Sequence, residues 1–337
     1  MANIALNFED GVTRIIDGLP GETVAESAYR VGINIPLDCA DGACGTCKCK
    51  VLSGSYDPGD YIEEALSDDE AENGYGLACQ MRPDSPLVVD ILASAAACKV
   101  EVTSVDTTIT SVEFLSAEVV RLIVSPVDGK AINFLPGQYV NIDVPGTDLS
   151  RSYSFSNRPN STDLSFLIRL VPNGVMSNFL TSAKVRDPLR LTGPLGSFYL
   201  RDLQQPSLFF AGGTGIAPFM SMLEKLSLEE VTQPIHLFYG STLAENMVEL
   251  ARLESFKEKI PLTVHTCVSG ETCAEHASGY VNQWINKDHL GLGSYDIYIC
   301  GPTAMVDAVK TSLADESITY SNFYMEKFVP SGTAVAV

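Results

Sequence analysis

The sequence has 337 residues, 42 of them acidic and 22 basic, which gives a formal net charge of −20. This charge repels phosphate backbones, so we do not expect a nucleic-acid partner; it fits a protein partner with a basic surface, or solubility alone. No apolar run reaches the roughly 18 residues that span a bilayer, and the N-terminal segment lacks an export signal, so we expect a cytoplasmic protein without membrane contact.

The first predicted domain, residues 1–98, combines short strand-like runs with four clustered cysteines. Two Ser/Thr-x-x-Glu capping boxes, Thr23 with Glu26 and Ser67 with Glu70, each predict the start of a helix. Short strands mixed with two helices indicate a small α+β unit.

Two further domains are predicted after residue 98. Residues 99–204 contain strand-length segments separated by Gly, Pro and Asn, with one helix-like stretch at 175–183, which indicates an antiparallel barrel or sandwich. Residues 205–337 alternate short apolar runs with helical stretches, including one at 244–256, which indicates a parallel sheet with helices on both faces.

The clustered cysteines give the strongest chemical signal. Cys39, Cys44 and Cys47 have the spacing C-x4-C-x2-C, and Cys79 follows after a further 31 residues. This spacing is typical of plant-type 2Fe-2S sites, in which four thiolates hold two irons. The small residues between the cysteines let the loop wrap a cluster and direct backbone N–H groups at its sulfurs. The motif resembles that of plant-type ferredoxins, which implies a β-grasp fold for this domain.

A structural zinc site is the alternative for these cysteines. Zinc motifs usually pair two short C-x2-C knuckles, whereas a single loop here supplies three ligands, so the spacing favours the cluster. Four other cysteines, Cys49, Cys98, Cys267 and Cys273, have no spacing partners and are expected to be structural thiols.

A second motif, Arg151-Ser152-Tyr153-Ser154, lies 13 residues after the turn that begins at Pro136. It offers an aromatic wall, a cation and two hydroxyls, which are the groups that a flavin with its phosphate needs. The motif resembles the flavin-binding motif of the ferredoxin-NADP reductase superfamily, whose flavin domain is an antiparallel Greek-key barrel. An ordinary exposed arginine in a strand is the alternative.

The same resemblance implies further flavin contacts downstream. Gly174 and Ser177 match a Gly-x-x-Ser motif that opens a helix next to the flavin pyrophosphate. The remaining candidates around this motif are Val175, Met176, Ile168 and Arg169. A capped helix without a ligand is the alternative.

A glycine-rich turn, Gly212-Gly213-Thr214-Gly215, follows the apolar run at 207–210 and precedes a predicted helix. A dinucleotide phosphate is expected there, with Gly215 keeping the helix start open for it. The turn lacks the G-x-G-x-x-G pattern, because Pro218 replaces the last glycine, but it matches the nicotinamide-domain motif of the same superfamily. The other expected contacts of the dinucleotide are Tyr239, Gly240, Ser241, Gly301 and Pro302.

Cys300 precedes Gly301 and Pro302 at the end of an apolar run, and the resemblance places this thiol beside the path of the hydride. Glu326 matches a carboxylate that neighbours the thiol, and Phe328 an aromatic that covers the flavin. A buried core thiol is the alternative for Cys300. The role of the nine residues after Phe328 is left open.

The region that usually selects between NADH and NADPH contains no basic residue from Tyr239 up to Arg252. Glu245 and Glu249 in the same region are expected to repel a 2′-phosphate, so the sequence predicts NADH.

All four motifs occur in superfamily order between about residues 100 and 328. With the cysteine motif, the chain resembles the reductase components of ring-hydroxylating dioxygenases, most closely those of benzoate, toluate and anthranilate dioxygenases. The resemblance implies FAD, a 2Fe-2S cluster, NADH and electron delivery to a Rieske oxygenase. The reductase of a di-iron monooxygenase, such as phenol or methane hydroxylase, is the alternative.

Overall fold

The computed structural model describes residues 2–37, 39–99, 102–286, 290 and 293–328, and the side chains within them up to Glu326. The chain forms two compact units. The N-terminal unit is Met1–Thr103 with Gly193–Ser197, and the larger unit is Ser104–Thr192 with Phe198–Val337. Among the described residues, no helix has both the length and the apolar character needed to cross a membrane.

The N-terminal unit is a β-grasp. Its five-stranded sheet has the order β2-β1-β7-β3-β5, in which β1 and β7 run parallel and the other pairs antiparallel. The elements are β1 (Ala2–Phe8), β2 (Thr13–Gly18), α1 (Val24–Arg30), β3 (Lys48–Ser53), β4 (Tyr56–Asp57), α2 (Asp68–Glu72), β5 (Tyr75–Leu77), β6 (Arg82–Pro83), β7 (Leu87–Ile91) and η1 (Ala97–Lys99).

Both capping boxes of this unit are confirmed. The Thr23 hydroxyl accepts from Glu26 N, and the Glu26 carboxylate accepts from Thr23 N at 2.8 Å, so α1 begins as predicted. Ser67 and Glu70 make the same reciprocal bonds at the start of α2. Each box satisfies N–H groups that the first helical turn leaves without partners.

The first part of the larger unit is an antiparallel barrel. Its sheet has the order β11-β10-β13-β8-β9-β12, and a bridge between Phe155 and Phe166 joins the two ends. Phe134, Phe155 and Phe166 are buried in its interior. The elements are β8 (Thr103–Phe114), β9 (Val119–Pro126), β10 (Tyr139–Asp143), β11 (Ser150–Ser154), β12 (Leu164–Arg169), α3 (Val175–Leu180) and β13 (Pro188–Leu195).

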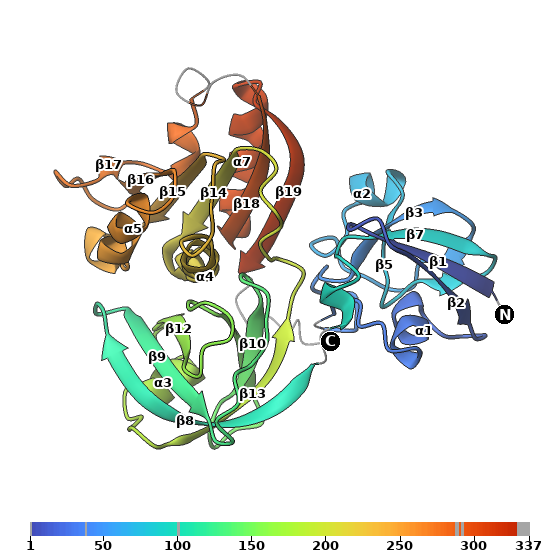
Figure 1. Ribbon diagram of the computed structural model, residues 1–337, viewed down its shortest axis with the longest axis horizontal. Coiled ribbons are helices and arrows are strands. Elements are labelled where there is room, and N and C mark those ends of the chain that lie inside the picture. The colour runs from blue at the N-terminus through green and yellow to red at the C-terminus, as the bar shows by residue number, and fades with distance from the viewer. Residues whose placement is uncertain (1, 38, 100–101, 287–289, 291–292, 329–337) are drawn as a thin grey trace. The chain divides into compact units, whose positions relative to one another are not determined.

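The second part is a six-stranded parallel sheet with the order β17-β16-β15-β14-β18-β19 (Figure 1). Phe209 packs with α4 and α5, whereas Phe210 packs with α7, so helices cover both faces as predicted. The elements are β14 (Ser207–Gly212), η2 (Gly213–Gly215), α4 (Ile216–Leu226), β15 (Ile235–Ser241), η3 (Ala244–Asn246), α5 (Leu250–Lys257), β16 (Leu262–Val268), β17 (Ala277–Ser278), η4 (Val281–Trp284), β18 (Ser294–Pro302), α7 (Thr303–Asp315) and β19 (Thr319–Phe328).

One predicted helix of this part is wrong in extent. The stretch 244–256 is not continuous, because η3 ends at Asn246 and α5 begins only at Leu250. Glu249 between them adopts the left-handed conformation with φ 67°, which a helix cannot contain.

Candidate functional site

The cysteine loop of the N-terminal unit is shaped by two glycines with positive φ. Gly42 has φ 83°, and a Cβ there would lie 2.3 Å from the Asp60 carbonyl oxygen. Gly45 has φ 72°, and a Cβ there would lie 2.8 Å from the Ala65 carbonyl oxygen. Only glycine fits both the conformation and the space at these positions. The loop directs the backbone N–H groups of Ala43 and Cys44 at the Cys39 sulfur, each at 3.3 Å.

The cysteine thiols of the motif affect one another's pKa. Cys47 donates to the Cys79 sulfur, which lowers the pKa of Cys79 to about 6 and raises that of Cys47. Burial raises the pKa of Cys39 to about 12, and its thiol also hydrogen-bonds Asp41 and Cys44. Four cysteines supply the number of thiolates that a cluster of two irons takes, two for each iron. In the part of the chain that the structure describes, no three His, Cys, Asp or Glu side chains are placed so that they could together hold one metal ion.

The remaining cysteine of this region is directed elsewhere. Cys49 is 0% exposed on β3, and its thiol contacts the Gly76 carbonyl at 3.5 Å and the Met81 sulfur at 3.6 Å. Cys98 is buried as well. Both thiols therefore lie in the core of the β-grasp, in agreement with a structural role.

The predicted flavin strand is β11, which pairs with β10. Because side chains alternate along a strand, Arg151 and Tyr153 share one face, and Ser152 and Ser154 share the other. Ser152 donates to Asn141 Oδ1 at 2.6 Å. The Tyr153 ring packs against the barrel core, and burial raises the pKa of its hydroxyl. The donor set of β11 thus fits a flavin, and the individual contacts stay predictions.

The second flavin motif lies at the start of α3. A Cβ at Gly174 would lie 2.5 Å from the Val171 side chain, so the turn requires glycine here. The Ser177 hydroxyl accepts from Val171 N at 2.9 Å, so part of its hydrogen-bonding capacity closes the turn. Val175 and Met176 form the first turn of α3, and Met176 is buried in the barrel core.

Two more flavin candidates lie on β12. Ile168 is only 1% exposed and packs in the barrel core, so its backbone alone is available for contact with a cofactor. Arg169 is exposed and lies 3.6 Å from the Glu118 carboxylate.

The glycine turn follows β14, as predicted, but Gly215 is needed for a different reason. A Cβ at Gly215 would lie 2.3 Å from the Cys300 carbonyl oxygen. The glycine therefore permits η2 to pack against β18, and a larger residue would first displace Cys300 rather than block a phosphate. Gly213, with φ 55° and open space around its Cα, faces no such contact, and Thr214 lies between the two glycines.

Cys300 and Glu326 lie side by side at the carboxyl ends of β18 and β19, where they are register partners. The Ser154 hydroxyl, from the barrel, donates to Glu326 Oε2 at 3.2 Å. The Cys300 thiol is 0% exposed, and burial, with the nearby Glu326 carboxylate, raises its pKa well above the ordinary value. The arrangement thus joins a neutral thiol, a carboxylate and a hydroxyl from two sheets of the larger unit.

The burial of the Cys300 thiol should be visible in its reactivity. Cys273 is half-buried, whereas Cys300 is buried and protonated, so iodoacetamide should alkylate Cys273 at least about tenfold faster in the native protein. Mass spectrometry of peptides after timed labelling measures both rates. Equal rates would contradict the buried placement of the Cys300 thiol.

The other predicted dinucleotide contacts are buried residues, glycines in close contact with neighbouring side chains, or residues at strand ends. Tyr239 is 0% exposed, and its hydroxyl accepts from Val248 N at 3.2 Å. At Gly240 a Cβ would lie 2.7 Å from Val281, and at Gly301 2.5 Å from Met305. Ser241 is half-buried at the end of β15, and Pro302 is exposed just before α7. The backbone of Phe328 pairs with Pro302, and its side chain lies outside the described residues.

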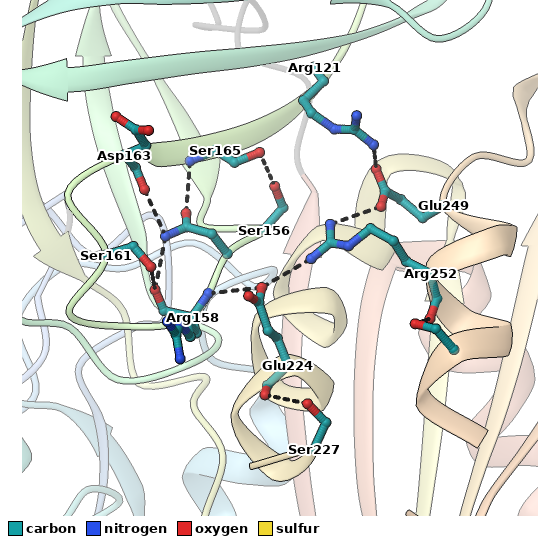
Figure 2. Close-up of polar contacts among 12 residues, drawn as sticks. Arg121, Ser156, Arg158, Ser161, Asp163, Ser165, Glu224, Ser227, Glu249 and Arg252 are labelled. Atoms are coloured by element: carbon teal, nitrogen blue, oxygen red, sulfur yellow. Dashed lines mark hydrogen bonds and ion pairs between the residues drawn. The ribbon is translucent and has the colours of Figure 1, made fainter. Parts of the chain in front are cut away.

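Glu249 does not face a bound dinucleotide, which corrects its predicted role in repelling a 2′-phosphate. Its side chain is 0% exposed and pairs with Arg121 of β9 and with Arg252 of α5, the latter at 2.9 Å (Figure 2). Arg252 also pairs with Glu224 of α4 at 3.0 Å. The residue at the break between η3 and α5 is thus tied by ion pairs to β9 and α5. Sequence patterns did not reveal this network, because Arg121, Glu224 and Glu249 are distant from one another in the chain.

The network is expected to stabilise the larger unit. Arg121→Ala should lower its free energy of unfolding by about 2 to 3 kcal/mol, because a buried carboxylate loses one partner while Arg252 stays. Urea denaturation followed by flavin release measures the change. Arg190→Ala is the control, since Arg190 and Asp106 are both exposed and such pairs contribute less than about 1 kcal/mol. Equal losses in free energy of unfolding in Arg121→Ala and Arg190→Ala would contradict a stabilising role of the buried ion pairs.

Three family models match successive parts of the chain. They are the 2Fe-2S iron-sulfur cluster binding domain at residues 7–84, the oxidoreductase FAD-binding domain at 106–199 and the oxidoreductase NAD-binding domain at 209–311. The toluate 1,2-dioxygenase electron transfer component of Pseudomonas putida is 49% identical over 331 residues, which cover 97% of this chain and 98% of that protein. The chain belongs to the family of dioxygenase electron transfer components.

Two further comparisons agree with this membership. The 2-halobenzoate 1,2-dioxygenase electron transfer component of Burkholderia cepacia is 43% identical over 98% of both chains. The crystal structure of an Amycolatopsis cytochrome P450 reductase is similar with a TM-score of 0.74 at 28% identity, covering 97% of this chain and 99% of that one.

The electron transfer component is therefore an oxidoreductase with a 2Fe-2S cluster, FAD and NADH as its cofactors. Its partners are NADH and an oxygenase. The predicted fold class and family are confirmed, and the di-iron monooxygenase alternative is not favoured.

Proposed function

We propose that this component oxidises NADH and delivers single electrons to the Rieske oxygenase of an aromatic-acid, benzoate-type 1,2-dioxygenase. The hydrogen bond between Ser154 and Glu326 carries the proposal, because it brings the flavin strand to the Cys300 end of the nucleotide sheet. We also propose domain limits at 1–98, 99–204 and 205–337, a cytoplasmic location, and no role for nucleic acid or membranes.

The three cofactors together can convert a two-electron donor into a source of single electrons. NADH gives two electrons as a hydride and a 2Fe-2S cluster takes one, so the bound FAD supplies the conversion between the two. Plant-type clusters have potentials near about −400 mV and Rieske centres between roughly −150 and +300 mV, so transfer to a Rieske oxygenase is favourable.

The chain's own residues position the reactants for hydride transfer. Gly215 lets the turn after β14 pack directly on Cys300. This contact holds Cys300 in place at the site where a nicotinamide ring would bind. The buried thiol is neutral and therefore adds no charge beside the ring. Ser154 and Glu326 hold one another at the edge of β11, where a flavin is expected. Placement of the two rings within about 3 to 3.5 Å is the main contribution that such a site makes to the rate.

The cysteine loop serves the one-electron step. Backbone N–H groups of Ala43 and Cys44 already point at the Cys39 sulfur, which is the arrangement that stabilises negative charge on a cluster ligand. Cys44 is exposed, so this side of the loop is open to a partner protein.

Cross-reduction assays test the choice of partner. The component is reduced with NADH and mixed with purified oxygenases, and the absorbance of each acceptor is followed. We expect rapid reduction of the Rieske oxygenase of a benzoate-type dioxygenase and none of a di-iron hydroxylase or a cytochrome P450. Turnover with the di-iron hydroxylase alone would overturn the proposal.

A further inference from the structure

The second and third strands of the nucleotide sheet stay hydrogen-bonded beyond their carboxyl ends. After β15 and β16 end, Ser269 N donates to the Ser241 carbonyl at 3.1 Å, and Gly270 N to that of Thr242 at 2.8 Å. A Cβ at Gly270 would lie 2.8 Å from the Thr242 carbonyl oxygen, so the close approach of the two loops requires glycine.

This approach places the next residue, Glu271, against the loop that follows β15. Glu271 Oε1 accepts from Ala244 N at 2.5 Å. Among the residues that the structure describes, Glu271 Oε2 takes no hydrogen bond, and the side chain is exposed. One carboxylate oxygen therefore anchors the side chain to the loop after β15, while the other has no hydrogen bond among the described residues and belongs to an exposed side chain.

The strand order shows which part of a dinucleotide passes this point. The glycine turn after β14 lies at the centre of the sheet, with Cys300 on β18 to one side and β15 and β16 to the other. A dinucleotide whose pyrophosphate lies at the turn and whose nicotinamide lies at Cys300 must extend its adenosine towards β15 and β16. Glu271 stands at that end.

We propose that Glu271 selects NADH over NADPH by contacting the adenosine ribose. A carboxylate at this place accepts hydrogen bonds from the ribose hydroxyls and repels a 2′-phosphate. The inference rests on the proposed oxidation of NADH and assigns the selectivity to a residue on the loop after β16. It also replaces Glu249, which is buried in ion pairs.

Glu271→Gln separates the charge from the hydrogen bond, because the glutamine oxygen still accepts from Ala244 N. The ratio of kcat/KM for NADH to that for NADPH should fall at least about tenfold, which corresponds to about 1.4 kcal/mol. In calorimetry with adenosine fragments, the affinity of 2′,5′-ADP relative to 5′-AMP should rise by a similar factor. Glu275→Gln, on the same exposed loop, is the matched control and should change neither ratio.

The outcomes distinguish this inference from the proposed function. Unchanged ratios in Glu271→Gln, or equal changes in Glu275→Gln, would overturn the role of Glu271. A change in Glu271→Ala but not in Glu271→Gln would overturn it too, since the loop contact and not the charge would then matter. A parent protein that fails to oxidise NADH would instead overturn the proposed function, while the fragment affinities would still report on Glu271.

Discussion

Replacement of Cys79 by serine is expected to abolish electron delivery to the oxygenase while NADH still reduces the flavin. Cys79 pairs with Cys47 at the proposed cluster, and a serine oxygen is a poor ligand for iron that prefers thiolates. Loss of a residue that only supports a metal ligand costs 10- to 100-fold in affinity or activity, so loss of a ligand should cost at least about 100-fold. Stopped-flow absorbance measures flavin reduction, and oxygenase turnover measures delivery.

Cys49→Ser is the matched control for this prediction. The Cys49 thiol lies only two residues beyond Cys47 but contacts Gly76 and Met81 in the core. This variant should keep the visible absorbance and paramagnetic resonance signal of the cluster. If Cys79→Ser kept a signal of parent intensity and Cys49→Ser lost it, the ligand assignment would be wrong.

Cys300→Ala should slow flavin reduction at saturating NADH by about 10- to 100-fold, with a much smaller change in NADH affinity. Cys300 lies between Gly215 and Glu326, so its loss leaves a void under the ring site and misplaces the ring. Misplacement by about 1 Å can cost 100-fold in rate. A loss in the rate constant without a loss in binding indicates an interaction made during the reaction. Single-turnover stopped-flow at several NADH concentrations separates the two.

Cys267→Ala provides the control, because this thiol is also buried, on β16 of the same sheet. It should leave flavin reduction within about twofold of the parent, as expected for a core thiol that does not touch the reactants. Parent-like reduction in Cys300→Ala would show that this residue, too, is only a packing thiol. Gly215→Val would not test phosphate binding cleanly, since the added side chain would displace Cys300 itself.

Local sequence patterns predicted most of the fold. The capping boxes at Thr23 and Ser67 start helices because their partners lie three residues away, within the pattern. The apolar runs of β14, β15, β16 and β18 are bounded by turns and form the predicted strands. The stretch that forms β19 carries polar and aromatic residues without a clear period, and it becomes a strand by pairing with β18.

The site was less predictable where distant residues meet. The resemblance suggested that Glu326 neighbours Cys300, and the register of β18 and β19 makes the two residues partners. The hydrogen bond from Ser154 to Glu326 was not predicted from the sequence. The ion pair of Glu249 with Arg121 spans 128 residues of sequence, so no local pattern could show that Glu249 is buried. Glu271 also becomes informative only through the hydrogen bonds between two strand ends.

The most direct test of the central claim is anaerobic mixing of the complete component with NADH, followed by optical and paramagnetic resonance detection. We expect that the flavin absorbance bleaches first and that the signal of a reduced 2Fe-2S cluster appears afterwards, at the same rate as the flavin loses an electron. In Cys79→Ser the bleaching should remain and the cluster signal should be absent. A cluster that becomes reduced without prior bleaching of the flavin, or a flavin that NADH does not bleach, would contradict the account.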